Sequence, residues 1–277
     1  MFRIKSPSLF INYLLSSTVI RPINRHLSSK SYFLANLKCK NLVSITGKDS
    51  IDFLQGLITN DVRQLSFDDD QTNSTSPSSC IYSFILNNNG RIIADLFVHR
   101  FKQSADDNDA IIFLEVDHQL STILTKLLKR YKIKSKVSIK LSEPEWQCYA
   151  LFPDVAENHP NEIVRLNDMD SKTILVNDPR NNHFGYKMIS TIPSKDELIC
   201  RLKEMNSSSD WKITEVDENR YCSFRYQYGI GEGSLDFPIE SSLPFDANGD
   251  ILNGISFQKG LFVSKWLFHI INIFFVL

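Results

Sequence analysis

A β-hairpin signal in the first half of the chain constrains its fold more than any other feature. Two apolar segments, residues 80–86 and 92–101, flank the run Asn87-Asn88-Asn89-Gly90. An Asn-Gly pair between strand-like segments is a strong turn signal, because both residues tolerate the left-handed backbone that a tight turn needs. The sequence therefore predicts two antiparallel strands joined by a tight turn.

Further strands and amphipathic helices are predicted around this hairpin. The spacing of apolar residues predicts strands at 42–45, 111–116, 137–141, 148–152 and 173–176, and helices at 48–57, 120–131, 195–205 and 217–228. Thr46 and Asp49 are the candidate N-caps of the first helix. The second helix carries one apolar stripe of Leu120, Ile123, Leu124, Leu127, Leu128 and Tyr131. Hairpins without repeated β-α-β units favour an α+β fold over a doubly wound sheet.

Composition agrees with a soluble protein. The 277 residues are 42% hydrophobic and 23% charged, so the chain can bury a substantial core as one large domain or two smaller ones. The formal net charge is −1, which supplies no overall basic field for a polyanion. No nucleic-acid partner is therefore expected.

The N-terminus has the composition of a targeting segment. No acidic residue precedes Asp49, and the basic residues that alternate with serines and aliphatic residues are Arg3, Lys5, Arg21, Arg25 and Lys30. A secretory signal is the alternative, because residues 9–20 are fairly apolar. That stretch is interrupted by polar residues, and no small-x-small cleavage site follows it. We therefore predict a mitochondrial transit peptide at residues 1–33 and location in the mitochondrial matrix.

The cysteines and histidines indicate neither a disulfide framework nor a metal site. The five cysteines are scattered, odd in number and never in a C-x-x-C pair: Cys39, Cys80, Cys148, Cys200 and Cys222. The six histidines show no ligand spacing either. The sequence predicts no metal ligand set and agrees with a reducing compartment.

Several motifs along the chain match one protein family in order. The first is Phe53-Leu54-Gln55-Gly56-Leu57-Ile58-Thr59-Asn60-Asp61, and the second is Phe84-Ile85-Leu86-Asn87 with Gly90-Arg91-Ile92-Ile93-Ala94-Asp95. Then come Asp178-Pro179-Arg180 with Gly185, Tyr221 with Arg225, and Gly229-Ile230-Gly231-Glu232-Gly233. The last are Pro238-Ile239-Glu240-Ser241 and Gly254-Ile255-Ser256-Phe257 with Lys259-Gly260. Together they resemble the folate-binding YgfZ-like family, whose relatives include the aminomethyltransferase (T protein) of glycine cleavage. The mitochondrial branch, which assembles iron-sulfur clusters, is the most similar.

This resemblance implies a domain plan. The expected α+β fold is the folate-binding-like fold of the T protein with its C-terminal β-barrel domain missing. A first subdomain is expected at residues 34–142 and a second at 143–260, which ends in the family signature. Residues 261–277 are expected to be an aberrant hydrophobic tail. Phe262-Val263 still resembles the family, and we predict that the terminus is intron read-through, because Val263-Ser264-Lys265 is what a common splice-donor sequence would encode. The apolar end, about twelve residues, is short of the roughly twenty needed to span a bilayer, so no membrane partner is expected.

The second motif bears on one-carbon transfer. The resemblance implies that the aminomethyltransferases have two acidic residues in this motif and that a carboxylate there acts on the one-carbon transfer. The first of the two positions is Ala94 here. Losing one carboxylate weakens the case for a transferase, because such a group orients the amine and stabilises cationic character. Asp95 remains, either as a site residue or paired with Arg91 on one face of the hairpin.

Glu240 is the other acidic candidate. The resemblance implies that this residue contacts the pterin ring of tetrahydrofolate, and a carboxylate suits a guanidine-like edge because it accepts two parallel N–H bonds. The alternative is a solvated loop acid after Pro238. The candidate folate site implied by the resemblance comprises Glu240, Asp95, Arg91 and Asn87.

The family signature is altered at one position. The resemblance implies a cysteine after Lys259-Gly260, and Leu261 stands there. A thiolate binds iron whereas an alkyl side chain cannot, so the cluster ligand of the family is absent. This chain should therefore either fail to share a cluster or act through contacts that need no thiol.

Two functions remain open. The first is a non-enzymatic factor that works with A-type carrier proteins to mature mitochondrial [4Fe-4S] proteins and has tetrahydrofolate as a candidate ligand. The second is a tetrahydrofolate-dependent one-carbon transferase. The resemblance to the mitochondrial branch and the Ala94-Asp95 pair favour the first.

Overall fold

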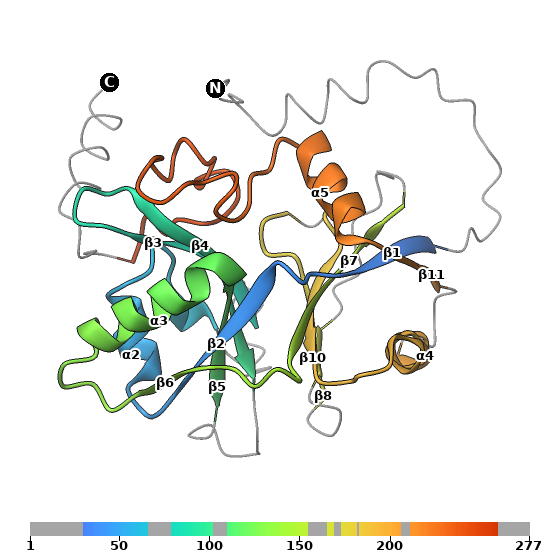
Figure 1. The fold of residues 1–277 in the computed structure, drawn as a ribbon, viewed down its shortest axis with the longest axis horizontal. Helices are drawn as coiled ribbons and strands as arrows, with labels where there is room; N and C mark the ends of the chain where they lie inside the picture. Colours follow the sequence, from blue (N-terminus) through green and yellow to red (C-terminus); the bar gives the residue numbers. More distant parts are fainter. Residues whose placement is uncertain are drawn as a thin grey trace.

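Two β-sheets that pack against each other form the centre of the molecule. The computed structural model describes residues 30–65, 79–101, 110–154, 165–168, 173–181, 183–205 and 211–259. Helices α2 and α3 lie outside one sheet and α4 lies outside the other, so the layers run helix, sheet, sheet, helix across Figure 1. Residues 1–29 of the expected transit peptide, Gly260 and the whole expected tail, residues 261–277, lie outside the described residues.

The first sheet has five antiparallel strands in the order β3-β4-β5-β2-β6. Their bounds are β2 Lys40–Thr46, β3 Cys80–Leu86, β4 Ile92–Phe101, β5 Ile111–Asp117 and β6 Ser138–Leu141. Strands β3 and β4 form the predicted hairpin, in which Gly90 has a φ of 75°. Glycine adopts this left-handed conformation readily because it has no Cβ. The Asn-Gly signal therefore located the turn correctly.

The second sheet has six strands in the order β11-β1-β7-β10-β9-β8. Their bounds are β1 Lys30–Asn36, β7 Gln147–Pro153, β8 Arg165–Asp168, β9 Thr173–Asn177, β10 Tyr186–Ser190 and β11 Trp211–Val216. The β1–β11 pair is parallel and the other pairs are antiparallel. Four of these strands, β1, β8, β10 and β11, were not predicted.

The helices are α2 Ser50–Gln55, the 3₁₀ helix η1 Val62–Gln64, α3 His118–Tyr131, α4 Lys195–Met205 and α5 Glu218–Gln227. All four predicted helices are confirmed to within a few residues. Asp49 is the N-cap of α2, but its side chain makes no cap hydrogen bond and accepts one from Lys136 N at 2.6 Å. Among the described helices, none combines the length and hydrophobicity that a membrane span requires.

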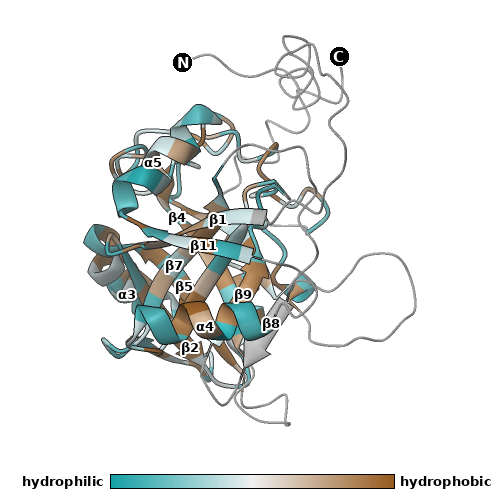
Figure 2. Cartoon of the chain, turned by 90° about the vertical axis from the view of Figure 1, so that its right-hand side faces the viewer, coloured by the Kyte–Doolittle hydropathy of each residue, from teal (hydrophilic) through white to brown (hydrophobic). Residues whose placement is uncertain are grey.

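Three hydrophobic clusters occupy the interfaces between these layers. One lies between the first sheet and α2 with α3, and one between the second sheet and α4. The third joins the two sheets and includes Tyr221 and Phe224 of α5. Figure 2 shows apolar residues concentrated in several strands, including β4, β5 and β9, with polar and apolar residues both present along α4. The space between the sheets is therefore interior, and any polar group there has to find a partner within the protein.

The expected boundary between subdomains, at residues 142 and 143, stays a prediction. The sheets do not divide the chain so simply, because β1 leaves the N-terminal half to pair with β7 and β11. Strand β1 also begins at Lys30, inside the segment expected to be a transit peptide. Long-range pairing of this kind leaves no local signal in the sequence.

Candidate functional site

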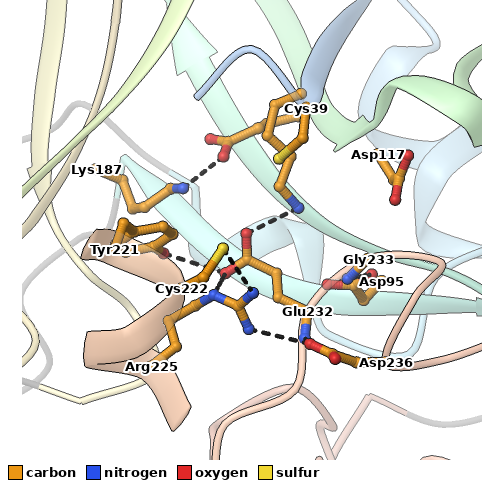
Figure 3. Close-up of polar contacts among 12 residues, drawn as sticks. Cys39, Asp95, Asp117, Lys187, Tyr221, Cys222, Arg225, Glu232, Gly233 and Asp236 are labelled. Carbon is orange, nitrogen blue, oxygen red and sulfur yellow. Dashed lines mark hydrogen bonds and ion pairs between the residues drawn. The ribbon is translucent and has the colours of Figure 1, made fainter. Parts of the chain in front are cut away.

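Charged side chains are buried where the two sheets meet. This inter-sheet charge network consists of four cations and five carboxylates: Lys40, Arg180, Lys187 and Arg225, with Asp95, Glu115, Asp117, Asp178 and Glu232. Figure 3 shows that several of these side chains point toward one another from the strands, from α5 and from the loop after α5. Buried charges are tolerated only when they are paired, and this set is close to neutral.

Glu232 is at the centre of the network. It belongs to the glycine-rich loop after α5, and one carboxylate oxygen lies 2.8 Å from Lys40 Nζ. The other oxygen accepts hydrogen bonds from Arg180 at 2.8 Å and from the Tyr221 hydroxyl at 3.1 Å. Burial would raise the pKa of Glu232, but the surrounding cations outweigh it and hold that pKa well below its usual value. Glu232 is therefore an anion at neutral pH.

Arg180 connects Glu232 to a second carboxylate. Its guanidinium donates from Nε and Nη2 to the two oxygens of Asp178, at 3.0 and 2.7 Å. This is the bidentate geometry that suits a planar guanidinium, and the turn after β9 provides it by placing the two residues two positions apart. The Arg180 guanidinium carbon also lies 4.7 Å from the ring centroid of Phe97. Arg180 is thus fixed on every side.

Lys187 and Glu115 form an ion pair between the two sheets. Lys187 Nζ, on β10, lies 2.5 Å from Glu115 Oε1 on β5, and both side chains are fully buried. The other oxygen of Glu115 lies 3.0 Å from His99 Nε2. Burial opposes ionisation of Glu115, but Lys187 and His99 lower its pKa to about 2. Lys187 Nζ also sits 4.3 Å from the Phe97 ring centroid, a favourable cation–π position.

Asp95 is the only residue of the predicted folate site that lies in this network. Its Oδ1 accepts a hydrogen bond from Gly233 N at 3.0 Å, and its Oδ2 accepts one from the Tyr82 hydroxyl at 3.4 Å. Burial raises the pKa of Asp95 above its ordinary value. The predicted Arg91–Asp95 pair is wrong, because β4 begins at Ile92 and leaves Arg91 in the exposed turn.

Ala94 and Asp95 point to opposite faces of β4. Ala94 belongs to the cluster beneath α2 and α3, whereas Asp95 faces the second sheet. Successive strand residues alternate in this way. A carboxylate at position 94 would therefore point into an apolar core, so Ala94 does not mark a group lost from the space between the sheets.

Three carboxylates of the network are held too tightly for general acid or base catalysis at neutral pH. Glu232, Glu115 and Asp178 are each held by two or more donors or cations. A general base needs an accessible lone pair and a pKa near the working pH. The network instead cross-links strands of both sheets to α5 and its following loop.

The other three predicted folate residues gather at the hairpin turn. Asn87 Oδ1 accepts hydrogen bonds from Asn89 N and Arg91 N, at 2.9 and 3.0 Å, which closes the turn. The Arg91 guanidinium donates to Ser241 O at 2.6 Å. Glu240 donates from its backbone to Ile92 O at 2.8 Å, has a φ of 61°, and exposes its side chain.

These four residues do not fit tetrahydrofolate as a set. Asn87 and Arg91 use their polar groups to hold the turn and the chain around Ser241. Asp95 faces the interior between the sheets, where Gly233 and Tyr82 cover it. Glu240 lies on the surface beside Ile92, about 10 Å along β4 from Asp95 at the usual strand rise. The two carboxylates therefore do not face a common space.

The family signature closes against the first motif. Lys259 Nζ donates to the carbonyls of Ile58 and Asn60, at 2.5 and 2.9 Å. The Asn60 side chain in turn donates to Asn253 O at 2.7 Å. Desolvation lowers the pKa of Lys259 to about 8. Lys259 thus joins the two ends of the described family sequence, which are about two hundred residues apart.

Thr59 offers a test of this junction. Its buried hydroxyl accepts from Phe84 N at 2.9 Å and donates to Gly254 O at 2.6 Å. We expect Thr59→Val to lower the free energy of unfolding by about 2 kcal/mol, because both backbone groups lose a partner. Urea unfolding measures this. The control is Thr125→Val, which loses only a hydrogen bond to Ser121 O within α3 and should change the free energy of unfolding by less than about 0.5 kcal/mol. Equal losses of stability in the two variants would contradict the prediction.

The described cysteines do not form an alternative cluster site. Within the described ranges no group of three or more His, Cys, Asp or Glu side chains could hold a metal ion. Burial raises the pKa values of the Cys39, Cys80 and Cys148 thiols, which keeps them protonated at neutral pH. A protonated thiol is a poor iron ligand.

Most of the network was missed by the sequence analysis. Arg180, Tyr221, Arg225 and Glu232 were recognised as parts of motifs without a role, and Lys40, Glu115 and Lys187 were not singled out. A signal for the last two was present, because each is a charge with apolar neighbours on both sides within its strand or at its start. Such a charge has to be paired in the interior, but the sequence does not say with which partner.

Comparison with known proteins identifies relatives along most of the chain, although no protein-family model matches it. The chain is 30% identical to the mouse (Mus musculus) iron-sulfur cluster assembly factor IBA57, mitochondrial, over 82% of this chain and 58% of that protein. The homologues from Coccidioides immitis and Mycosarcoma maydis are 32% and 27% identical, over 82% and 87% of this chain and 50% and 54% of theirs. The chain therefore spans little more than half the length of these relatives.

A solved structure shows the same fold. The crystal structure of glycine cleavage system aminomethyltransferase T from Bartonella henselae matches with a TM-score of 0.56 and 16% sequence identity. The match covers 80% of this chain and 57% of that one. The predicted α+β, T-protein-like fold is confirmed.

Proposed function

This chain is homologous to the IBA57 iron-sulfur cluster assembly factors of mitochondria, and from that premise we propose that it assists the maturation of mitochondrial [4Fe-4S] proteins without catalysing a reaction. The mitochondrial names of the relatives agree with the acid-free, basic N-terminal segment, and we place the protein in the matrix. The proposed partners are A-type carrier proteins.

The internal pairing of the inter-sheet charge network carries the non-enzymatic part of this proposal. Where a transferase needs an accessible carboxylate, Asp95 is buried between Gly233 and Tyr82, and Glu232 is bound by Lys40 and Arg180. Neither of these two carboxylates is therefore accessible as a base, and Glu232 joins strands of both sheets. A rigid, catalytically silent body suits a protein that presents surfaces to partners.

The test is complementation in cells that lack their own assembly factor. We expect expression of this chain to restore the activity of a mitochondrial [4Fe-4S] hydro-lyase, while a [2Fe-2S] protein in the same cells is unchanged. Failure of a well-expressed, imported chain to restore the enzyme would contradict the proposal. Restoration of both classes to the same extent would point to an earlier and more general step.

The role of the absent thiol is tested separately with purified proteins. Because Leu261 cannot bind iron, we expect reconstitution with an A-type carrier to give no cluster shared by the two proteins. The Leu261→Cys variant should gain one, seen by visible absorption and by co-elution of iron with both chains. A shared cluster that already forms with the unaltered chain would overturn the loss-of-ligand interpretation.

The T-protein-like fold favours a second candidate, a tetrahydrofolate-dependent one-carbon transferase. Titration with tetrahydrofolate, followed by an assay for the one-carbon product, separates the two. We expect no turnover, because Asp95 and Glu240 do not face a common space. Tetrahydrofolate binding itself stays a prediction that the same titration tests, and Glu240→Gln is the variant that should weaken it.

A further inference from the structure

A strongly basic surface extends from the second half of α3 to β6. Its seven basic residues, here called the basic patch, are Lys126, Lys129, Arg130, Lys132, Lys134, Lys136 and Lys140. No acidic residue occurs between Asp117 and Glu143 in the sequence, although the whole chain has a net charge of −1. All of the patch except Lys132 is exposed. Six of the seven lie in α3 and the loop after it, whereas Lys140 on β6 points to the face of the sheet opposite α3, because its neighbour Ile139 packs in the cluster beneath that helix.

Three apolar side chains in or beside this patch are exposed, one of them almost fully. Ile133 is 85% exposed and Tyr131 is 37% exposed. Ile123, about two helical turns before Tyr131 on the apolar stripe of α3, is 47% exposed. Only Leu120, Leu124 and Leu128 of that stripe are buried. Ile133 is thus the one nearly fully exposed apolar side chain among these cations in the described residues.

The loop that carries Ile133 is held in a fixed shape. Ile133 has a φ of 32°, which is unfavourable for a β-branched residue, and Ser135 N donates to Lys132 O at 2.7 Å beside it. Lys136 N donates to the Asp49 carboxylate at 2.6 Å, which ties the loop to the start of α2. Strained, exposed positions persist where the surroundings fix them, and they concentrate at functional sites. The loop lies at the edge of the molecule in Figure 1.

We propose that the basic patch, with Ile133 at its tip, docks the protein on an anionic phospholipid surface. Within the described part of the chain, none of the seven cationic side chains forms an ion pair. The six cations of α3 and the loop after it can therefore contribute to attraction by a negatively charged bilayer, and Ile133, with the exposed part of Tyr131, can enter the headgroup region. This docking is peripheral and revises the expectation of no membrane partner. It does not rest on the proposed assembly function.

The choice of side chains favours lipid over a protein or a nucleic acid. Six of the seven are lysines, which act as mobile point charges, whereas arginine is preferred for bidentate recognition of a specific carboxylate or phosphate. Lysine is also depleted in protein–protein interfaces. Binding to a diffuse anionic surface requires many flexible positive charges and an apolar side chain that can insert, but no directional hydrogen-bond partner. This loop provides both the charges and the apolar side chain.

Vesicle co-sedimentation of the full chain tests the proposal. The vesicles contain phosphatidylcholine alone or with about one third phosphatidylglycerol, so that only the second kind carries charge. We expect binding to the anionic vesicles that falls at high salt. Lys134→Glu with Lys136→Glu should weaken it at least tenfold, because each basic residue near such a surface contributes a factor of about five. Ile133→Ser should weaken it several-fold.

A matched pair of charge reversals provides the control. Lys203→Glu with Lys212→Glu changes two exposed lysines on α4 and β11, the far side of the molecule, and should leave vesicle binding unchanged. The proposal is overturned if the two double variants bind the anionic vesicles equally well. That result would mean that the basic N-terminus or the net charge of the protein causes the binding. It is also overturned if the unaltered chain does not bind the vesicles but binds RNA or an acidic protein through the same lysines.

Discussion

Glu115→Gln is expected to lower the free energy of unfolding by about 3–5 kcal/mol, because it leaves the Lys187 ammonium buried without its counter-charge. Both side chains of this pair are fully buried, and the substitution changes charge while keeping shape. Such a loss is a large fraction of the 5–15 kcal/mol of a typical domain. The shift of the urea midpoint, monitored by tryptophan fluorescence, measures it.

A surface pair of the same chemistry is the matched control for Glu115→Gln. Glu215 on β11 pairs with Lys195 of α4, and both side chains are more than two-fifths exposed. Solvent screens such a pair, so Glu215→Gln should cost less than about 1 kcal/mol. The double variant Glu115→Gln, Lys187→Met should recover much of the loss, because it removes the unpaired charge. Equal midpoints for Glu115→Gln and Glu215→Gln would contradict this account.

The same ion pair gives a pH dependence of known sign. The pKa of Glu115 falls from 4.5 to about 2 on folding, since Lys187 and His99 outweigh the cost of burial. The contribution of this group, about 3 kcal/mol, is present above pH 4.5 and is lost as the pH falls toward 2. The stability difference between the unaltered chain and Glu115→Gln should therefore narrow below about pH 4.5. A difference that stays constant down to pH 3 would exclude Glu115 as its source.

Gly185→Ala is expected to destabilise the second sheet by at least about 3 kcal/mol. Gly185 has a φ of 87°, and a Cβ at this position would lie 2.2 Å from Leu151 O on the neighbouring strand β7. The obstacle is backbone, so it cannot rotate away. The change would push β10 from β7 and displace Lys187, two residues further along. Thermal and urea unfolding both measure the effect, and failure to yield folded protein agrees with it.

Gly56 is the matched control for this substitution. It follows α2 with a φ of −80°, and the nearest atom to an added Cβ, Phe53 O, is 3.9 Å away. Gly56→Ala should be neutral, or stabilise by up to about 1 kcal/mol through the unfolded state. If Gly185→Ala kept the unfolding midpoint of the unaltered chain, the packing of β10 on β7 described here would be wrong.

Local patterns predicted those elements that local chemistry forms. The β3–β4 hairpin followed from Asn-Gly between apolar segments, and α3 and α4 followed from apolar spacing. Strands β8 and β10 are short, and strands β1 and β11 pair with each other although most of the chain separates them in sequence. No local sequence signal therefore identified these four strands. The apolar spacing of α3 also did not reveal that Ile123 and Tyr131 are exposed.

The sequence by itself determined the order of strands and helices, the hairpin turn and the family resemblance, because turn residues and apolar periodicity act between neighbours in the chain. Only the tertiary structure decided which charges are buried together. Glu115 meets Lys187, and Lys40 meets Glu232, across strands that are far apart in sequence. A buried charge requires a partner, but Coulomb attraction depends on distance in space, and that distance is set by the packing of the two sheets.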